Sequence, residues 1–172
     1  MQTQTVSEQG TAKRATMAQT NKYLTFELAK ETYGIGILKI REIIKVMEIT
    51  PLPHASDSVK GVINLRGKII PVVDLRMRFG VEVSEFTDRT CIVVVDLETE
   101  DGVRTLVGAT VDAVEEVSQI PAGDIEPPPA LGGGASDGYI QGMAKLKGKV
   151  VILLDIDKVL GAGLGGIPQA MS

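Results

Sequence analysis

The sequence predicts a mainly β protein with short helices, built from two copies of a small all-β unit that pack together. Hydrophobic residues make up 44% of the 172 residues, which is typical of a folded chain. Aromatic residues make up only 3% and Trp is absent, so the core is expected to consist mainly of Val, Ile and Leu. Such side chains favour strands. The second observation is an internal repeat.

The repeat pairs residues 59–75 with residues 140–156. Its identical positions are Gly61 and Gly142, Leu65 and Leu146, Gly67 and Gly148, Lys68 and Lys149, and Asp74 and Asp155. Each copy has the pattern of a β-hairpin, with a Gly in the turn, where positive φ is needed, and an apolar second strand. Asp74 and Asp155 end the second strands and are expected to be the N-caps of short helices.

A weaker similarity lies upstream, where residues 34–43 align with residues 108–117. An apolar strand precedes each of these segments, and the strands throughout are short and closely spaced. This spacing favours small barrels or strongly bent sheets over a parallel α/β sheet. The chain is therefore interpreted as a tandem duplication.

The duplication predicts subdomain 1 at about residues 21–84 and subdomain 2 at about residues 85–162, with exchange of chain ends allowed between them. A unit of this size buries only about 60% of its unfolded surface and is marginal alone. The two subdomains are therefore expected to share a core, with a groove at their junction. Residues 1–20 and 163–172 are expected to be flexible tails.

Charge and cysteine content exclude several kinds of protein. The net charge is −4 and the basic residues are dispersed, so no basic face for a nucleic acid is expected. Cys91 is the only cysteine, which excludes an intrachain disulfide, and its apolar neighbours predict a buried, inert thiol. The sequence has no signal-peptide pattern and no apolar run of about 18 residues, so a cytoplasmic protein is expected.

No group of residues in the sequence predicts catalysis. His54, the single histidine, has no potential metal ligand at a suitable spacing, so a solvated loop residue is favoured over a ligand or general base. Gly132–Gly134 follows prolines, which favours a loop over a phosphate site. The acidic pairs at residues 98–101 and 115–116 are interpreted as solvated charges rather than a catalytic pair. We expect no enzymatic activity, no metal and no other cofactor.

Two charged residues are candidates for function. Arg66 occupies the turn of the first repeat, where the second copy has Lys147. The planar guanidinium suits bidentate partners, so the difference suggests a distinct role for the first turn; the alternative is an ordinary solvated residue. Glu42 follows an apolar stretch that is ambiguous between a helical turn and a strand.

The motif Gly61-Val-Ile-Asn-Leu-Arg-Gly67, followed by Pro71-Val-Val-Asp-Leu75, resembles CheW-type coupling proteins of bacterial chemotaxis. Supporting similarities are Tyr33-Gly-Ile-Gly-Ile-Leu-Lys39, Arg41-Glu-Ile43 and Ile125-Glu-Pro-Pro-Pro129. The resemblance covers about residues 22–160. It implies two five-stranded SH3-like β-barrels packed together and a non-enzymatic adaptor, recruited to membrane-associated receptor arrays without inserting into the membrane.

The resemblance also implies two partners. The cytoplasmic tip of a chemoreceptor would bind near the junction of the subdomains, where matching motifs place Glu42, Arg66 and Ile40. Glu42 and Arg66 would either contact the receptor tip directly or form an ion pair with each other that shapes the binding surface. The regulatory domain of the histidine kinase CheA, itself CheW-like, would contact the ends of the barrels. Leu131 is assigned by the same resemblance to a kinase or scaffold contact.

Two other functions remain open at this point. One is a small-ligand sensor or enzyme that uses the groove between the subdomains. The other is a β-barrel scaffold that assembles with itself and has no receptor partner.

Overall fold

The computed structural model describes residues 21–55, 57–81, 83, 85–98, 102–128 and 138–161. The expected tails, 1–20 and 163–172, lie outside this part of the chain. The strands are β1 (Lys22–Leu28), β2 (Glu31–Gly36), β3 (Ile40–Lys45), β4 (Val59–Leu65), β5 (Lys68–Asp74), β6 (Cys91–Glu98), β7 (Arg104–Val111), β8 (Ala113–Gln119), β9 (Ile140–Leu146) and β10 (Lys149–Leu154). The short helices are η1 (Ile37–Lys39), α2 (Leu75–Phe79), η2 (Ala122–Asp124) and α3 (Ile156–Gly161).

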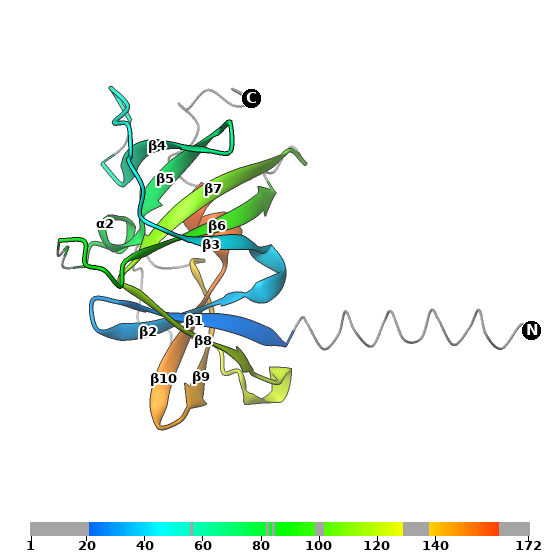
Figure 1. Cartoon of the computed structure of the whole chain (residues 1–172). Helices are drawn as coiled ribbons and strands as arrows, with labels where there is room; N and C mark the ends of the chain where they lie inside the picture. Colours follow the sequence, from blue (N-terminus) through cyan, green and yellow to red (C-terminus); the bar gives the residue numbers. More distant parts are fainter. Residues whose placement is uncertain are drawn as a thin grey trace, which may run out of the picture.

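The strands form two five-stranded sheets, which Figure 1 shows one above the other. Sheet A has the order β8-β1-β2-β10-β9, and sheet B has the order β3-β6-β7-β5-β4. The two orders become identical when each strand is replaced by its counterpart in the repeat. Each sheet contains one parallel pair, β2 with β10 and β5 with β7. The prediction of a mainly β fold with two five-stranded units and short helices is confirmed.

The two sheets do not coincide with the two halves of the sequence. Sheet A combines β1 and β2 with β8, β9 and β10, while sheet B combines β3, β4 and β5 with β6 and β7. The chain crosses from sheet A to sheet B through η1, between β2 and β3. It crosses back at Asp112, between β7 and β8. Residues 21–84 and 85–162 therefore each contribute strands to both sheets.

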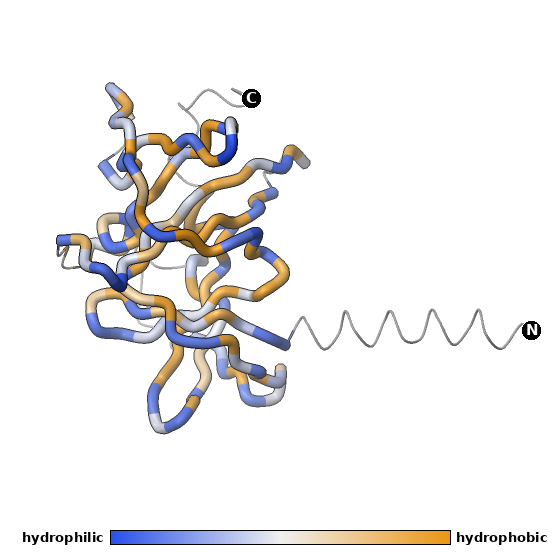
Figure 2. Tube along the Cα trace, in the orientation of Figure 1, coloured by the Kyte–Doolittle hydropathy of each residue, from blue (hydrophilic) through white to orange (hydrophobic). Residues whose placement is uncertain are grey.

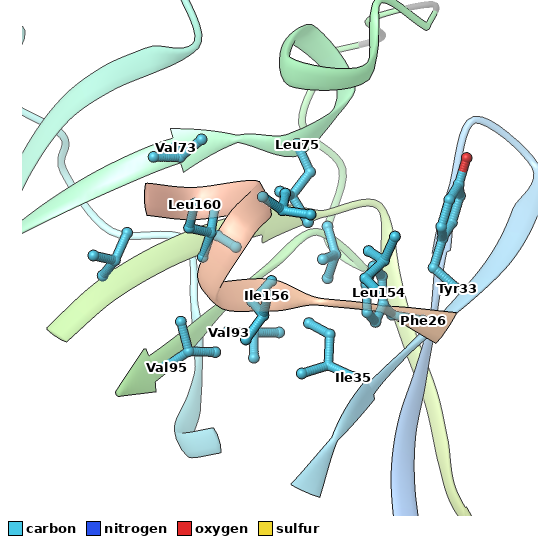
Figure 3. Packing of buried hydrophobic residues seen from close by; sticks show 14 of the residues in the cluster. Phe26, Tyr33, Ile35, Val73, Leu75, Val93, Val95, Leu154, Ile156 and Leu160 are labelled. Atoms are coloured by element: carbon cyan, nitrogen blue, oxygen red, sulfur yellow. The ribbon is translucent and has the colours of Figure 1, made fainter. Parts of the chain in front are cut away.

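One apolar cluster joins the sheets at their junction. It contains Phe26 and Ile35 from sheet A, Val93 from sheet B, and Ile156 and Leu160 from α3, all buried (Figure 3). Each sheet also encloses a smaller cluster of its own. Figure 2 shows the corresponding pattern, with apolar stretches inside the strands and hydrophilic residues at the turns of the hairpins. The expectation of a shared core agrees with this packing.

The two predicted hairpins are present, β4–β5 and β9–β10. Arg66 and Lys147 have φ angles of 52° and 53°, and the following glycines take positive φ as well. The predicted N-caps are also found. The carboxylate of Asp74 accepts a hydrogen bond from the backbone N–H of Arg76 at 2.9 Å, and that of Asp155 accepts one from the N–H of Lys158 at 3.3 Å.

The prediction for Cys91 is wrong, because the residue is partly exposed rather than buried. It is the first residue of β6, so the apolar run that follows it enters the core while the thiol stays at the end of the strand, 3.4 Å from the carbonyl of Arg89. His54 is exposed, in a turn with φ 62°. Among the described residues, no helix is long and apolar enough to span a bilayer.

Candidate functional site

The side chains of Arg66 and Glu42 meet in a two-point ion pair. Nη1 of Arg66 donates to Oε1 of Glu42 at 2.6 Å, and Nη2 donates to Oε2 at 2.8 Å. The Arg66 side chain is 73% exposed and that of Glu42 25%. The hydrogen bond from Arg66, together with its charge, holds the pKa of Glu42 below its ordinary value against the opposing effect of desolvation. The guanidinium thus has the bidentate partner that its geometry suits.

Curvature of sheet B brings these two residues together. Glu42 lies on the edge strand β3, and Arg66 lies at the turn of the hairpin that ends at the opposite edge, β4. The turn is held by a hydrogen bond of 2.8 Å from the N–H of Gly67 to Oδ1 of Asn64. The contact between opposite edges closes the sheet like a barrel.

Ile40 begins strand β3, two residues before Glu42. A bulge interrupts the pairing of β3 with β6 between these residues. Ile40 is half-buried and packs against the cluster shared by the two sheets. The structure therefore brings Glu42 and Arg66 into contact and keeps Ile40 on the same strand at the sheet junction. Leu131 lies outside the described residues.

A cavity of about 270 Å³ lies at η1, just before this strand, where the chain crosses between the sheets. Its lining is Tyr23, Gly36, Ile37, Leu38, Lys39, Gln141, Leu154, Asp155, Ile156 and Asp157. Leu38 is 54% exposed; Val150 and Val117 are exposed to a similar degree, but of these three only Leu38 lines the cavity. The sequence analysis did not identify this lining. The apolar stretch before Glu42 was a signal, but it was ambiguous because η1 interrupts the alternation of a strand.

An ion pair crosses the edge of the cavity. Nζ of Lys39, in η1, lies 2.7 Å from Oδ2 of Asp157, in α3, and both side chains are partly exposed. The other oxygen of Asp157 accepts a hydrogen bond of 3.2 Å from the N–H of Glu98, at the end of β6. Polar contacts at the edge of the cavity thus connect η1 and α3, which line it, to the end of β6, which does not.

The Arg66–Glu42 pair has a counterpart in sheet A. Nζ of Lys147, at the β9–β10 turn, lies 2.7 and 2.9 Å from the two carboxylate oxygens of Glu116 on β8. Lys147 matches Arg66 in the repeat, and Glu116 matches Glu42. The hydrogen bond from Lys147 lowers the pKa of Glu116 from its ordinary value. The duplication therefore produced two equivalent ion pairs, of which only the one with arginine has a planar fork.

The other candidates for chemistry form no reactive group among the described residues. No three His, Cys, Asp or Glu side chains there come together as a metal site. Glu115 accepts a hydrogen bond of 3.3 Å from the hydroxyl of Thr32, and Glu116 is engaged by Lys147. Glu98 is exposed. Residues 99–101 and Gly132–Gly134 lie outside the part of the chain that the structure describes.

Comparison with known proteins identifies the family. The family model of the CheW-like domain matches residues 22–163. The chain belongs to the CheW-like family. Among CheW proteins, it is 36% identical over 141 residues to the chemotaxis protein CheW of Klebsiella aerogenes, covering 82% of each chain. It is 33% identical to the chemotaxis protein CheW of Thermotoga maritima, covering 80% of this chain and 85% of that protein.

A solved CheW structure has the same fold. The scaffolding protein TtCheW from Thermoanaerobacter tengcongensis is 35% identical, with a TM-score of 0.72, and the match covers 81% of this chain and 87% of that one. Membership of the CheW-like family assigns the chain to chemotaxis signalling, as a coupling adaptor. The sequence resemblance is confirmed, and the alternative of a ligand sensor or enzyme in the groove gains no support.

Proposed function

We propose that the chain couples the cytoplasmic tip of a chemoreceptor to the regulatory domain of the kinase CheA. The receptor tip binds at the cavity beside η1 and at the adjoining Arg66–Glu42 pair. The observation that carries the proposal is that Leu38 is exposed at the cavity, while β3, which starts two residues later, carries Glu42 in a two-point ion pair with Arg66.

The chemistry of this surface suits a helical hairpin. Apolar side chains of a helix can cover Leu38 and Ile37, while Ile40 and Glu42 extend the contact along β3. Arg66 is exposed beyond its pair with Glu42, so the guanidinium has further donors to offer to a partner. A few such residues are expected to dominate the affinity.

The kinase contact is proposed for the ends of the barrels, with Leu131 as a contributing residue. Binding one partner raises the effective concentration of the next, so contacts of modest affinity hold an array together. The adaptor is thereby recruited from the cytoplasm to the membrane-associated receptors. We also propose that it has no catalytic activity. Of the charged residues around the cavity, Lys39 and Asp157 pair with each other, and Asp155 caps α3 and lies near Lys158.

The test is to titrate variants separately against a receptor cytoplasmic fragment and against the CheA regulatory domain. Arg66→Ala is expected to weaken receptor binding by roughly 30-fold, the effect of losing a central arginine, and Glu42→Arg is expected to weaken it further. Both variants should keep their affinity for the kinase, whereas Leu131→Ala should weaken kinase binding only.

Lys147→Ala is the matched control, because it removes the equivalent cation from the other sheet. It should leave receptor binding unchanged. If Arg66→Ala and Glu42→Arg lower both affinities together, the ion pair has only a structural role. If neither affinity falls, the receptor binds at another surface.

A further inference from the structure

The chain crosses between the two sheets at two places that are equivalent in the repeat. The charged side chains paired at these two crossings differ in how deeply they are buried. One is η1, where Lys39 pairs with Asp157 and both side chains are about one-third exposed. The other is at Asp112, which pairs with Arg76 of α2. The side chain of Arg76 is 2% exposed and that of Asp112 22%. Arg76 and Asp157 occupy matching positions after Asp74 and Asp155, so the repeat has placed an open pair at one crossing and a buried pair at the other.

Arg76 is held on both sides of its guanidinium. Nε and Nη2 each lie 3.1 Å from an oxygen of Asp74, which is fully buried, and Nη1 lies 3.1 Å from Oδ1 of Asp112. Burial acts to lower the pKa of Arg76, but the hydrogen bonds and charges of Asp74 and Asp112 outweigh it and raise the pKa. The guanidinium therefore remains charged inside the protein.

Asp112 continues this contact into sheet A. Its Oδ2 accepts a hydrogen bond of 2.7 Å from the N–H of Ala29, in the turn between β1 and β2. Its own N–H donates to the carbonyl of Glu27 at 2.9 Å. Arg76 belongs to α2, which directly follows β5 of sheet B. A continuous chain of charge-assisted hydrogen bonds thus runs from sheet B, through the crossing, to a hairpin of sheet A.

Most of the remaining contacts between the sheets are apolar, with one aromatic stack of Tyr33 in β2 on Phe79 in α2, ring centroids 5.6 Å apart. The shared cluster consists largely of Val, Ile and Leu side chains. Their burial supplies most of the attraction, but it is non-directional, and such cores tolerate changes of packing. Hydrogen bonds of a guanidinium fork, in contrast, require a defined orientation of donor and acceptor.

We propose that the buried Arg76–Asp112 contact sets the angle at which sheet A packs on sheet B. The same angle determines the shape of the cavity at the other crossing. That cavity is bounded by Tyr23 and Gln141 of sheet A and by Asp157 of α3. Asp157 in turn accepts a hydrogen bond from the backbone N–H of Glu98, the last residue of β6 in sheet B. Arg76 is in this sense a positioning residue. Replacing both partners of a buried ion pair by apolar residues often leaves stability unchanged, so the role proposed for this pair is to fix geometry.

The angle can be measured in solution without any partner, from residual dipolar couplings of the backbone N–H groups in the full chain. In the native protein, one alignment tensor should fit both sheets. In Asp112→Asn, which keeps the Asp74–Arg76 contact, each sheet should still fit by itself, but a joint fit should become clearly worse. Asp157→Asn, the matched change at the open crossing, should leave the joint fit as good as in the native protein.

Arg76→Lys provides a second variant. An ammonium keeps the positive charge beside Asp74 but cannot bridge both carboxylates as a planar fork does, so the same loss of the joint fit is expected. A joint fit that stays good in both Asp112→Asn and Arg76→Lys overturns the proposal. An equal loss in Asp157→Asn also overturns it, because the buried crossing would then have no special role.

Receptor titration of the same variants adds a readout that rests on the proposed function. Asp112→Asn should weaken receptor binding several-fold although Asp112 does not line the cavity. A changed angle with unchanged receptor affinity would support the positioning role of Arg76 and count against the cavity as the receptor site. The dipolar couplings thus test the positioning role of Arg76, and the titration tests the cavity as the receptor site, so one proposal can be wrong while the other holds.

Discussion

The guanidinium of Arg66 and the carboxylate of Glu42 form two parallel hydrogen bonds, of 2.6 and 2.8 Å, between opposite edges of sheet B. Lys147 and Glu116 repeat the contact in sheet A with a single ammonium. Glu42 of the pair with arginine lies on β3, which follows η1 at the cavity, and the two-point geometry orients both side chains. This geometry leads to the first prediction.

Arg66→Ala should raise the pKa of Glu42 towards the ordinary value of a glutamate, because the main cause of the lowering is the hydrogen bond from Arg66. The folded-state pKa of Glu42 is depressed. The pair therefore contributes its stability above the unfolded pKa, roughly 4.3, and the contribution is lost as the pH falls through the lower folded value. Carboxyl ¹³C NMR titration measures the change.

Lys147→Ala is the control for this titration. It should raise the pKa of Glu116 and leave that of Glu42 unchanged, because the two pairs lie in different sheets. A Glu42 titration that is the same with and without Arg66 would show that the pair does not persist in solution.

Gly61→Ala should destabilise the protein by at least about 2 kcal/mol. Gly61 has φ 148°, and a Cβ there would lie only 2.1 Å from the carbonyl oxygen of Thr50. That oxygen also accepts a hydrogen bond of 2.8 Å from the N–H of Val62, so Thr50 cannot move away freely. Chemical denaturation measures the free energy of unfolding.

Gly67→Ala separates backbone strain from steric clash. Gly67 also has positive φ, 88°, but a Cβ there meets no atom within 4 Å. We expect a loss of about 1 kcal/mol. Equal losses in the two variants would mean that contact with Thr50 is not the reason for Gly61.

Arg78→Met should stabilise the protein by about 1 kcal/mol, raising the melting temperature by about 2–4 °C. The Nε and Nη2 atoms of Arg78 are buried and have no hydrogen-bond partner in the described structure. Burial lowers the pKa of this arginine, against a smaller opposing effect of Tyr139. Methionine keeps an apolar side chain of adaptable shape without the unpaired donors.

Differential scanning calorimetry of Arg78→Met and of Arg89→Met makes this comparison. Arg89 is exposed and its nearest carboxylate oxygen, on Glu27, is 3.8 Å away, so its replacement should change stability by less than about 0.5 kcal/mol. A lower melting temperature for Arg78→Met would indicate that the guanidinium has an acceptor in solution.

The whole chain should unfold in one cooperative transition, with equal calorimetric and van't Hoff enthalpies. Both sheets contribute to the shared core, and neither is formed by one half of the sequence alone. The fragment 85–162 lacks β1 and β2, the central strands next to β8 and β10 in sheet A. A well-dispersed ¹⁵N NMR spectrum from that fragment would contradict this prediction.

Local features could be predicted because their causes lie within a few residues. The turns at Arg66-Gly67 and Lys147-Gly148 depend on positive φ at glycine, and the cap at Asp74 depends on a side chain two residues from its donor. Alternating and apolar runs predicted the strands between these points. Cys91 was mispredicted because a run of apolar residues does not show which residue at the start of the strand stays partly exposed.

Strand partners could not be predicted in the same way. The parallel pairs β2–β10 and β5–β7 join segments far apart in the sequence, and no local pattern distinguishes such a partner from another apolar strand. For the same reason the residues that line the cavity, the exposure of Leu38 and the contact between Arg76 and Asp112 were not predicted, although a groove at the junction was expected. Each depends on how the two sheets pack.

By itself, the sequence determined the hairpins and the caps, because these depend on turn chemistry. It also revealed the internal repeat and pointed to Arg66 and Glu42 as candidates for function, because these follow from short matching motifs. Only the tertiary structure decided that Arg66 and Glu42 touch each other. It also decided that one crossing between the sheets is buried while its repeat-related counterpart is open. The physical reason is that sheet curvature and packing arise from contacts between residues distant in sequence, and the repeat alone predicts two equal halves.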